Sequence, residues 1–221
     1  MAVLEAWRRM PHEARMAKKP RGGVGVGPRN PYTQRALDSA YKMQKQGNLQ
    51  QAEVFYHQVL QDEPGNPFAL YALGTIAIAR QEFEKAIPLL QESIANGYHA
   101  ETSYSHLGIA LQSTGRYQDA IDLYRSGAKL DPKNPRYLSN IAVVLTQMGQ
   151  PDQALAEIQK ALKLDPKFAS AYLNAGGILQ AMGRRSEAKT MYEKAAHLDP
   201  VNPEAHNALR RLNEDLNASG N

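Results

Sequence analysis

The chain of 221 residues contains no cysteine, and its apolar runs are far shorter than the ~20 residues that a membrane-spanning helix needs. The lack of cysteine excludes a disulfide framework, cysteine-based zinc or iron–sulfur sites, and a thiol nucleophile. The N-terminal residues also lack the continuous apolar stretch of a secretory signal. We therefore expect a soluble, cytoplasmic protein, with organellar or nuclear import left open.

Catalytic motifs are equally scarce. No P-loop, Gly-x-Ser-x-Gly elbow or kinase signature occurs, and no two of the six histidines stand four residues apart as in a helical zinc site. The glycine-rich stretch 22–27 superficially resembles a phosphate-binding loop, but Pro28 and Pro31 follow it where a helix should begin, so it is interpreted as a linker. We expect no enzyme activity, no cofactor and no metal.

The positive charge is concentrated at the N-terminus. Residues 1–30 hold seven Lys and Arg against two Glu, a net charge of +5, whereas the remaining residues hold 19 basic against 20 acidic side chains. A strongly basic repeat region would have indicated nucleic acid as the main partner. Residues 31–221 are close to neutral, so contact with nucleic acid or acidic lipid is expected only through the N-terminal tail, residues 1–30.

The tripeptide Leu-Asp-Pro recurs at residues 130–132, 164–166 and 198–200, with a spacing of 34 residues. Extending this period in both directions gives five units. Their ranges are 33–66, 67–100, 101–134, 135–168 and 169–202. A fixed period of this length is typical of a protein that stacks one small structural unit repeatedly.

Small side chains recur at two positions of the unit. Position 20 is Ala52, Ala86, Ala120, Ala154 and Ala188, and position 8 is Ala40, Gly74, Gly108, Ala142 and Gly176. We interpret these as places where two helices approach too closely for a larger side chain. Glycine at position 15 and proline at position 32, each present in four units, are typical of helix ends.

This pattern resembles the tetratricopeptide repeat (TPR), which the third unit matches most fully. The matching residues are Tyr104, Leu107, Gly108, Leu111, Ala120, Tyr124 and Pro132. The resemblance implies an all-α fold, a right-handed α-solenoid of antiparallel helix pairs. Each unit is then expected to hold helix A at about positions 1–14 and helix B at about positions 17–30.

Three segments flank the five units. Residues 1–32 are a basic tail with the glycine-rich linker, residues 203–217 are expected to form a capping helix with a polar outer face, and residues 218–221 are expected to be disordered. Asn202 is placed as the N-cap of the capping helix, and Pro203 as its first residue.

The unit 67–100 departs from the pattern. Gln81 replaces the position-15 glycine, Tyr98 replaces the terminal proline, and Pro88 stands inside helix B, where it removes one backbone hydrogen bond. We expect an irregular link over residues 95–99.

Helix-A residues at positions 2, 5, 6, 9 and 12 usually line the concave face of TPR proteins, which binds an extended peptide or a partner helix. The resemblance therefore implies a groove made of Phe68, Tyr71, Thr75, Ile78, Thr102, Ser105, His106, Ile109, Gln112, Arg136, Ser139, Asn140, Val143, Thr146, Ser170, Leu173, Asn174, Gly177 and Gln180. The alternative is that these residues are only the polar side of an amphipathic helix.

Position 6 carries a polar side chain in three successive units, His106, Asn140 and Asn174. An amide both donates and accepts, so a row of amides can bind a peptide backbone whatever its side chains. The two asparagines partly resemble the asparagine ladder in the TPR domain of O-linked N-acetylglucosamine transferases. The two-carboxylate clamp of chaperone-binding TPR domains is not matched, since Tyr71 and Ser105 stand where its lysine is required.

The tail contains a short stretch with the spacing of an amphipathic helix. Its residues are Val3, Leu4, Trp7 and Met10 on one stripe, with Arg8 and Arg9 off it. We consider a docking helix, a contact to acidic lipid or nucleic acid, an organellar presequence and a disordered tail.

The sequence favours a non-enzymatic scaffold or adaptor that binds a protein partner in the groove. Two alternatives remain. One is an assembly subunit that docks through the N-terminal helix and the solenoid edges, including a homo-oligomer formed through the solenoid ends. The other is a targeting arm for an enzyme on another chain.

Overall fold

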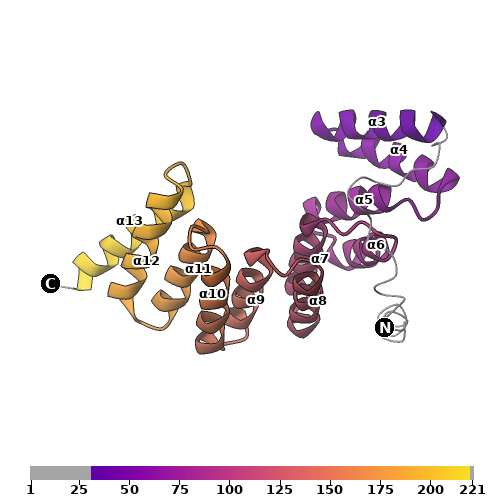
Figure 1. Cartoon of the computed structure of the whole chain (residues 1–221). Coiled ribbons are helices and arrows are strands. Elements are labelled where there is room, and N and C mark those ends of the chain that lie inside the picture. Colours follow the sequence, from indigo (N-terminus) through magenta and orange to yellow (C-terminus); the bar gives the residue numbers. More distant parts are fainter. Residues whose placement is uncertain (1–30, 220–221) are drawn as a thin grey trace. The chain divides into compact units, whose positions relative to one another are not determined.

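The computed structural model describes residues 31–219, with side chains as far as residue 215, and this range forms α-helices without any strand (Figure 1). The helices are α3 (Pro31–Lys45), α4 (Leu49–Asp62), α5 (Pro67–Ala79), α6 (Phe83–Ala95), α7 (Glu101–Ser113), α8 (Tyr117–Leu130), α9 (Pro135–Gln147), α10 (Pro151–Leu164), α11 (Ala169–Ala181), α12 (Arg185–Leu198) and α13 (Pro203–Ser219). The predicted all-α fold is confirmed. None of these described helices has the length and apolar character needed to cross a membrane.

The helices belong to two compact units. Unit 1 ends at Gly115 and contains α3 to α7, and unit 2 begins at Arg116 and contains α8 to α13. The boundary lies in the turn between helices A and B of the third sequence repeat. Inside the units, α3 packs on α4, α5 on α6, α9 on α10 and α11 on α12, as expected for helix pairs of single repeats.

The helix bounds follow the 34-residue period. Helix A of the second to fifth repeats covers positions 1–13, and helix B covers positions 17–29 or 17–30. Two bounds at the ends differ from the expected segments. Helix α3 begins at Pro31, before the first repeat unit, and α13 continues to Ser219, so residues 218–219 are helical and not part of a disordered C-terminus.

Each turn between helices A and B contains one residue in the left-handed region. Gly47, Gly115, Gly149 and Gly183 occupy it with φ between 72° and 76°. In the second repeat Gln81 takes the same conformation, with φ of 61°. The turn is therefore kept without glycine, at the steric cost that a Cβ atom has in this region.

Asparagine caps several helices. Asn66, Asn134 and Asn202 accept hydrogen bonds from the backbone N–H of Ala69, Arg136 and Glu204, at 3.0, 3.1 and 2.8 Å. The predicted cap at Asn202 is confirmed. Helix α7 instead follows Ala100, which has no capping side chain.

The position-8 glycines of the second and fifth repeats lie where helices A and B of the repeat meet. All five alanines at position 20 are 0% exposed. A Cβ atom on Gly74 would lie 2.6 Å from Leu90 Cγ, and one on Gly176 would lie 2.5 Å from two ring carbons of Tyr192. The interpretation of positions 8 and 20 as sites of close approach is therefore confirmed.

Candidate functional site: the helix-A surfaces of the two units

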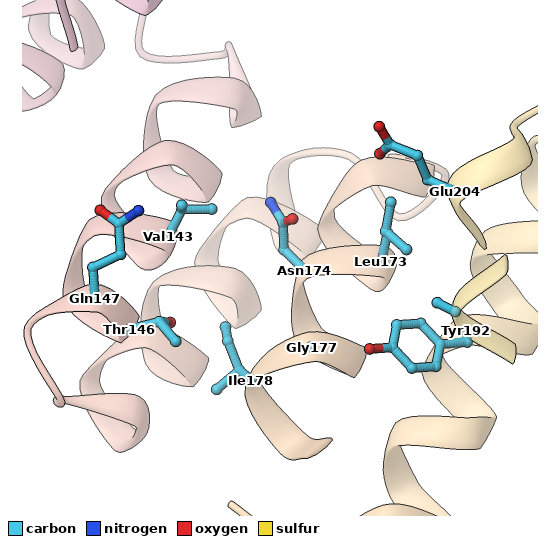
Figure 2. Close-up of a pocket in the computed structure, with 10 residues that line it drawn as sticks. Val143, Thr146, Gln147, Leu173, Asn174, Gly177, Ile178, Tyr192 and Glu204 are labelled. Atoms are coloured by element: carbon cyan, nitrogen blue, oxygen red, sulfur yellow. The ribbon is translucent and has the colours of Figure 1, made fainter. Parts of the chain in front are cut away.

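A pocket of about 390 Å³ opens on the helix-A side of unit 2. Its lining comes from α9, α11, α12 and α13, and Figure 2 shows how the side chains surround it. The lining residues are Val143, Thr146, Gln147, Leu173, Asn174, Gly177, Ile178, Tyr192, Glu204 and Ala208. The floor is largely apolar, and amide and carboxylate groups stand around it.

Asn174 is held in place by the neighbouring helix. Its Nδ2 donates to Ser139 Oγ at 2.9 Å, and Ser139 is only 1% exposed. Among the described residues, Asn174 Oδ1 accepts no hydrogen bond, so the amide presents an acceptor beside the pocket from an orientation that Ser139 fixes. This geometry suits a backbone N–H of a bound chain.

Tyr192 lines the pocket beside Gly177 (Figure 2). Its hydroxyl donates to Gln180 Oε1 at 2.9 Å, and burial raises the pKa of that hydroxyl above its ordinary value. The same arrangement recurs in unit 1, where Tyr56 donates to Gln44 at 2.7 Å and burial raises its pKa to about 12. In both repeats the bond links position 12 of helix A to position 24 of helix B, so these tyrosines serve as neutral structural groups.

Unit 1 has a smaller pocket of about 250 Å³ between α3 and α5. It is lined by Tyr41, Gln44, Lys45, Phe68, Tyr71, Ala72 and Thr75. Tyr98 extends this aromatic surface from the link after α6, because its ring lies 6.1 Å from Phe68 and 4.8 Å from Tyr71 between centroids. The residue that replaces the terminal proline of the second repeat thus packs against two predicted groove residues.

His106 joins this aromatic surface from α7. Its Nδ1 lies 3.1 Å from the hydroxyl of Tyr71, and the two rings are 5.6 Å apart. Burial lowers the pKa of His106 from its ordinary value of 6.5, and the backbone of Thr102 and the carboxylate of Glu101 oppose that shift. The imidazole is therefore biased toward its neutral form.

The predicted groove residues are at least partly exposed with one exception, Ser139, which is buried beneath Asn174 and cannot itself touch a ligand. Five of them line the pocket of unit 2 (Val143, Thr146, Leu173, Asn174 and Gly177), and three line the pocket of unit 1 (Phe68, Tyr71 and Thr75).

Several others lie outside these pockets and bond to their own helix or to a nearby loop. Ser105 donates to Glu101, Gln112 to the carbonyl of Gly108, and the Arg136 guanidinium lies 5.6 Å from the ring of Phe168. Ile78, Thr102, Ile109, Asn140, Ser170 and Gln180 also lie outside the two pocket linings.

Sequence reasoning missed some of the lining. Gln147 and Glu204 border the pocket of unit 2, and Tyr41 borders the pocket of unit 1. Counting positions onward into α13 would have found Glu204, since it occupies position 2 of a sixth helix A. The predicted docking residues Val3, Leu4, Trp7, Arg8, Arg9 and Met10 lie outside the described residues. In residues 31–219, no group of His, Asp and Glu side chains could hold a metal ion.

A family model described as tetratricopeptide repeat matches residues 43–101, 111–163 and 145–212. Among solved structures, that of MamA protein is 25% identical, with a TM-score of 0.63, and the match covers 76% of this chain and 92% of that one. YrrB, described as a TPR protein with an unusual peptide-binding site, is 19% identical with a TM-score of 0.59, and the match covers 82% and 98%.

TTC0263, a thermophilic TPR protein of Thermus thermophilus, is 19% identical with a TM-score of 0.64, and the match covers 81% and 98%. A comparison with curated proteins gave no match. The family model matches well over half of the chain, and the chain belongs to the tetratricopeptide repeat family, whose repeats are protein-interaction modules.

Proposed function

We propose that the chain is an adaptor that binds an extended segment or a helix of a partner protein on the helix-A surface of unit 2. The observation that carries this proposal is the pocket on α9, α11 and α13, where an anchored amide stands over an apolar floor. A partner's apolar side chain fits the floor formed by Val143, Leu173 and Ile178.

The polar groups at the pocket supply the rest of the recognition. Asn174 Oδ1 is available to accept from a backbone N–H, which supports binding that is tolerant of sequence. The Glu204 carboxylate borders the pocket and is exposed, which favours a lysine or arginine in the bound segment next to its apolar residue. The proposed ligand is thus a segment with an apolar anchor and a neighbouring basic side chain.

The test is selection of random peptides displayed on phage against the full chain, followed by affinity measurement. We expect the selected peptides to lose affinity for the double variant Asn140→Ala with Asn174→Ala. The matched control is Gln153→Ala with Gln159→Ala, which removes two exposed amides from helix B of the fourth repeat, α10. Deletion of residues 1–30 should leave these peptides bound.

Equal binding by both double variants would show that the amides of helix A are not used. Loss of binding only on deletion of 1–30 would favour the assembly subunit that docks through its tail. An affinity purification in which an enzyme activity accompanies the chain, and disappears when the partner is removed, would favour the targeting arm.

A further inference from the structure

We propose that the pocket between α3 and α5 of unit 1 is occupied by the chain's own segment Val3–Met10. This inference concerns unit 1 and an internal ligand, so it holds or fails independently of partner binding by unit 2. The pocket offers three aromatic rings, from Tyr41, Phe68 and Tyr71. Half of the Tyr41 side chain is exposed at this edge, so an apolar surface is open to a ligand here.

The segment has the chemistry to fill an aromatic pocket of this size. Trp7, the single tryptophan of the chain, stands three residues from Leu4 and Met10 and four from Val3, so these side chains fall on one face if the segment is helical. An indole against aromatic rings buries a large apolar area, and edge-to-face pairs add about 0.5–1.5 kcal/mol each.

The charges of the two partners are complementary. Residues 1–30 carry a net charge of +5, whereas residues 31–115 hold five Lys and Arg against eight Asp and Glu, a net charge of −3. Lys45 is the charged side chain among the lining residues, and its Nζ lies 5.0 Å from the centroid of the Tyr41 ring, where it can meet Glu5. Asp38 stands outside the lining, one turn before Tyr41 on α3, and its Oδ1 accepts from Gln34 Nε2 at 2.9 Å; a carboxylate at this position can pair with Arg8 or Arg9 of the docked segment.

The connection is long enough. Tyr41 stands ten residues beyond Pro31, the first residue of α3, which is about 15 Å along a helix. The twenty residues 11–30 reach up to about 70 Å when extended and have a root-mean-square span of about 25 Å as a flexible coil. Attachment at this length gives the segment an effective concentration in the millimolar range, so even a weak contact is well occupied.

The test uses the fluorescence of Trp7, which reports on one residue because no other tryptophan is present. We expect acrylamide to quench the full chain much less than it quenches a synthetic peptide of residues 1–20. Tyr41→Ala and Thr75→Arg, which open and fill the pocket respectively, should each raise quenching toward the peptide value. Val54→Ala removes a 66% exposed apolar side chain from α4, outside the pocket lining, and should change nothing.

Four results would overturn the proposal. Trp7 quenched as strongly in the full chain as in the peptide would show that it docks nowhere. Protection that survives both pocket variants would place Trp7 at another surface. Protection lost equally in Val54→Ala would show a general effect on unit 1. Protection that disappears on dilution would mean that a second copy supplies the segment.

Discussion

Two adjacent glycines of α11 give opposite predictions for the same substitution. Gly176 faces Tyr192, and a Cβ atom there would lie 2.5 Å from ring carbons Cδ1 and Cε1. Gly177 is exposed, and the nearest atom to its Cβ would be the Tyr192 hydroxyl at an ordinary 3.8 Å. We expect Gly176→Ala to destabilise the protein and Gly177→Ala to stabilise it.

The magnitudes follow from the packing of Tyr192. Replacing glycine by alanine inside a helix stabilises it by roughly 0.5–1 kcal/mol, and this gain applies to both positions. At Gly176 the added methyl must displace a ring that is 5% exposed and belongs to the core with Leu179 and Leu212, which costs about 1–3 kcal/mol. If the ring moves, its hydrogen bond to Gln180 adds about 1 kcal/mol to the loss. The helix gain is common to both variants, so they should differ by about 1–4 kcal/mol, the upper part of the range applying if the hydrogen bond is lost.

Urea denaturation followed by circular dichroism measures this difference through the midpoint, with equal slopes as the check that both variants unfold in the same way. The comparison is internal, because the two sites share a helix and the same chemical change. A Gly176→Ala variant as stable as Gly177→Ala would refute the claim that position 8 is a point of close helix approach.

Four further predictions concern local features. Gln81→Gly should raise the free energy of unfolding by about 0.5–1 kcal/mol, because it removes a Cβ atom from a residue with φ of 61°. Gly149→Ala should lower the free energy of unfolding by about 1 kcal/mol, because it adds a Cβ atom at φ of 72° although the space around it is open. Urea midpoints measure both changes. Asn66→Ala should cost about 1–2 kcal/mol in the same assay by removing the cap of α5, and Ala100→Asn should add up to about 1 kcal/mol by providing one for α7. Ala120→Leu should lower the thermal midpoint by an overpacking cost of about 1–3 kcal/mol, because its site is 0% exposed, and an unchanged melt would contradict the repeat alignment. Burial lowers the pKa of His106 below its ordinary 6.5, so as the pH falls the unfolded chain takes up this proton before the folded chain does. The contribution of His106 to the free energy of unfolding should therefore be constant above about pH 6.5 and decrease below it. In melts between about pH 8 and 5.5, His106→Gln should reduce the slope of stability against pH.

The sequence was sufficient to predict the helices and their contacts within a repeat. Ala154 and Gly176 are small because a neighbouring helix occupies the space that a longer side chain would need. The identity of a single residue at each position is enough to indicate this close packing. Helix ends are equally local, since a left-handed turn residue and an asparagine cap each act on the next few backbone groups. Gln81 is the exception, since the second repeat keeps the same left-handed turn residue without glycine.

Contacts made by the links between helices were much harder to predict. The aromatic surface of unit 1 depends on Tyr98, which the 34-residue pattern indicated only as a missing proline. Its ring contacts Phe68 and Tyr71, which lie about 30 residues earlier in the same repeat, from the link that follows α6. Side chains at corresponding positions of an ideal repeat say nothing about such a link.

The hydrogen bonds of the candidate site follow a rule that needs two repeats at once. Tyr71 bonds to His106 and Ser139 bonds to Asn174, and in both cases position 5 of one helix A meets position 6 of the next, 35 residues later. The sequence indicated the position-6 residues as ligand contacts, but it could not show that position 5 fixes them. Because Ser139 orients Asn174 before any ligand arrives, binding does not have to order that amide, a cost of about 0.5–1.5 kcal/mol for a free side chain. In the proposed site, the buried Ser139, which no ligand can touch, therefore contributes to recognition by holding Asn174 in place.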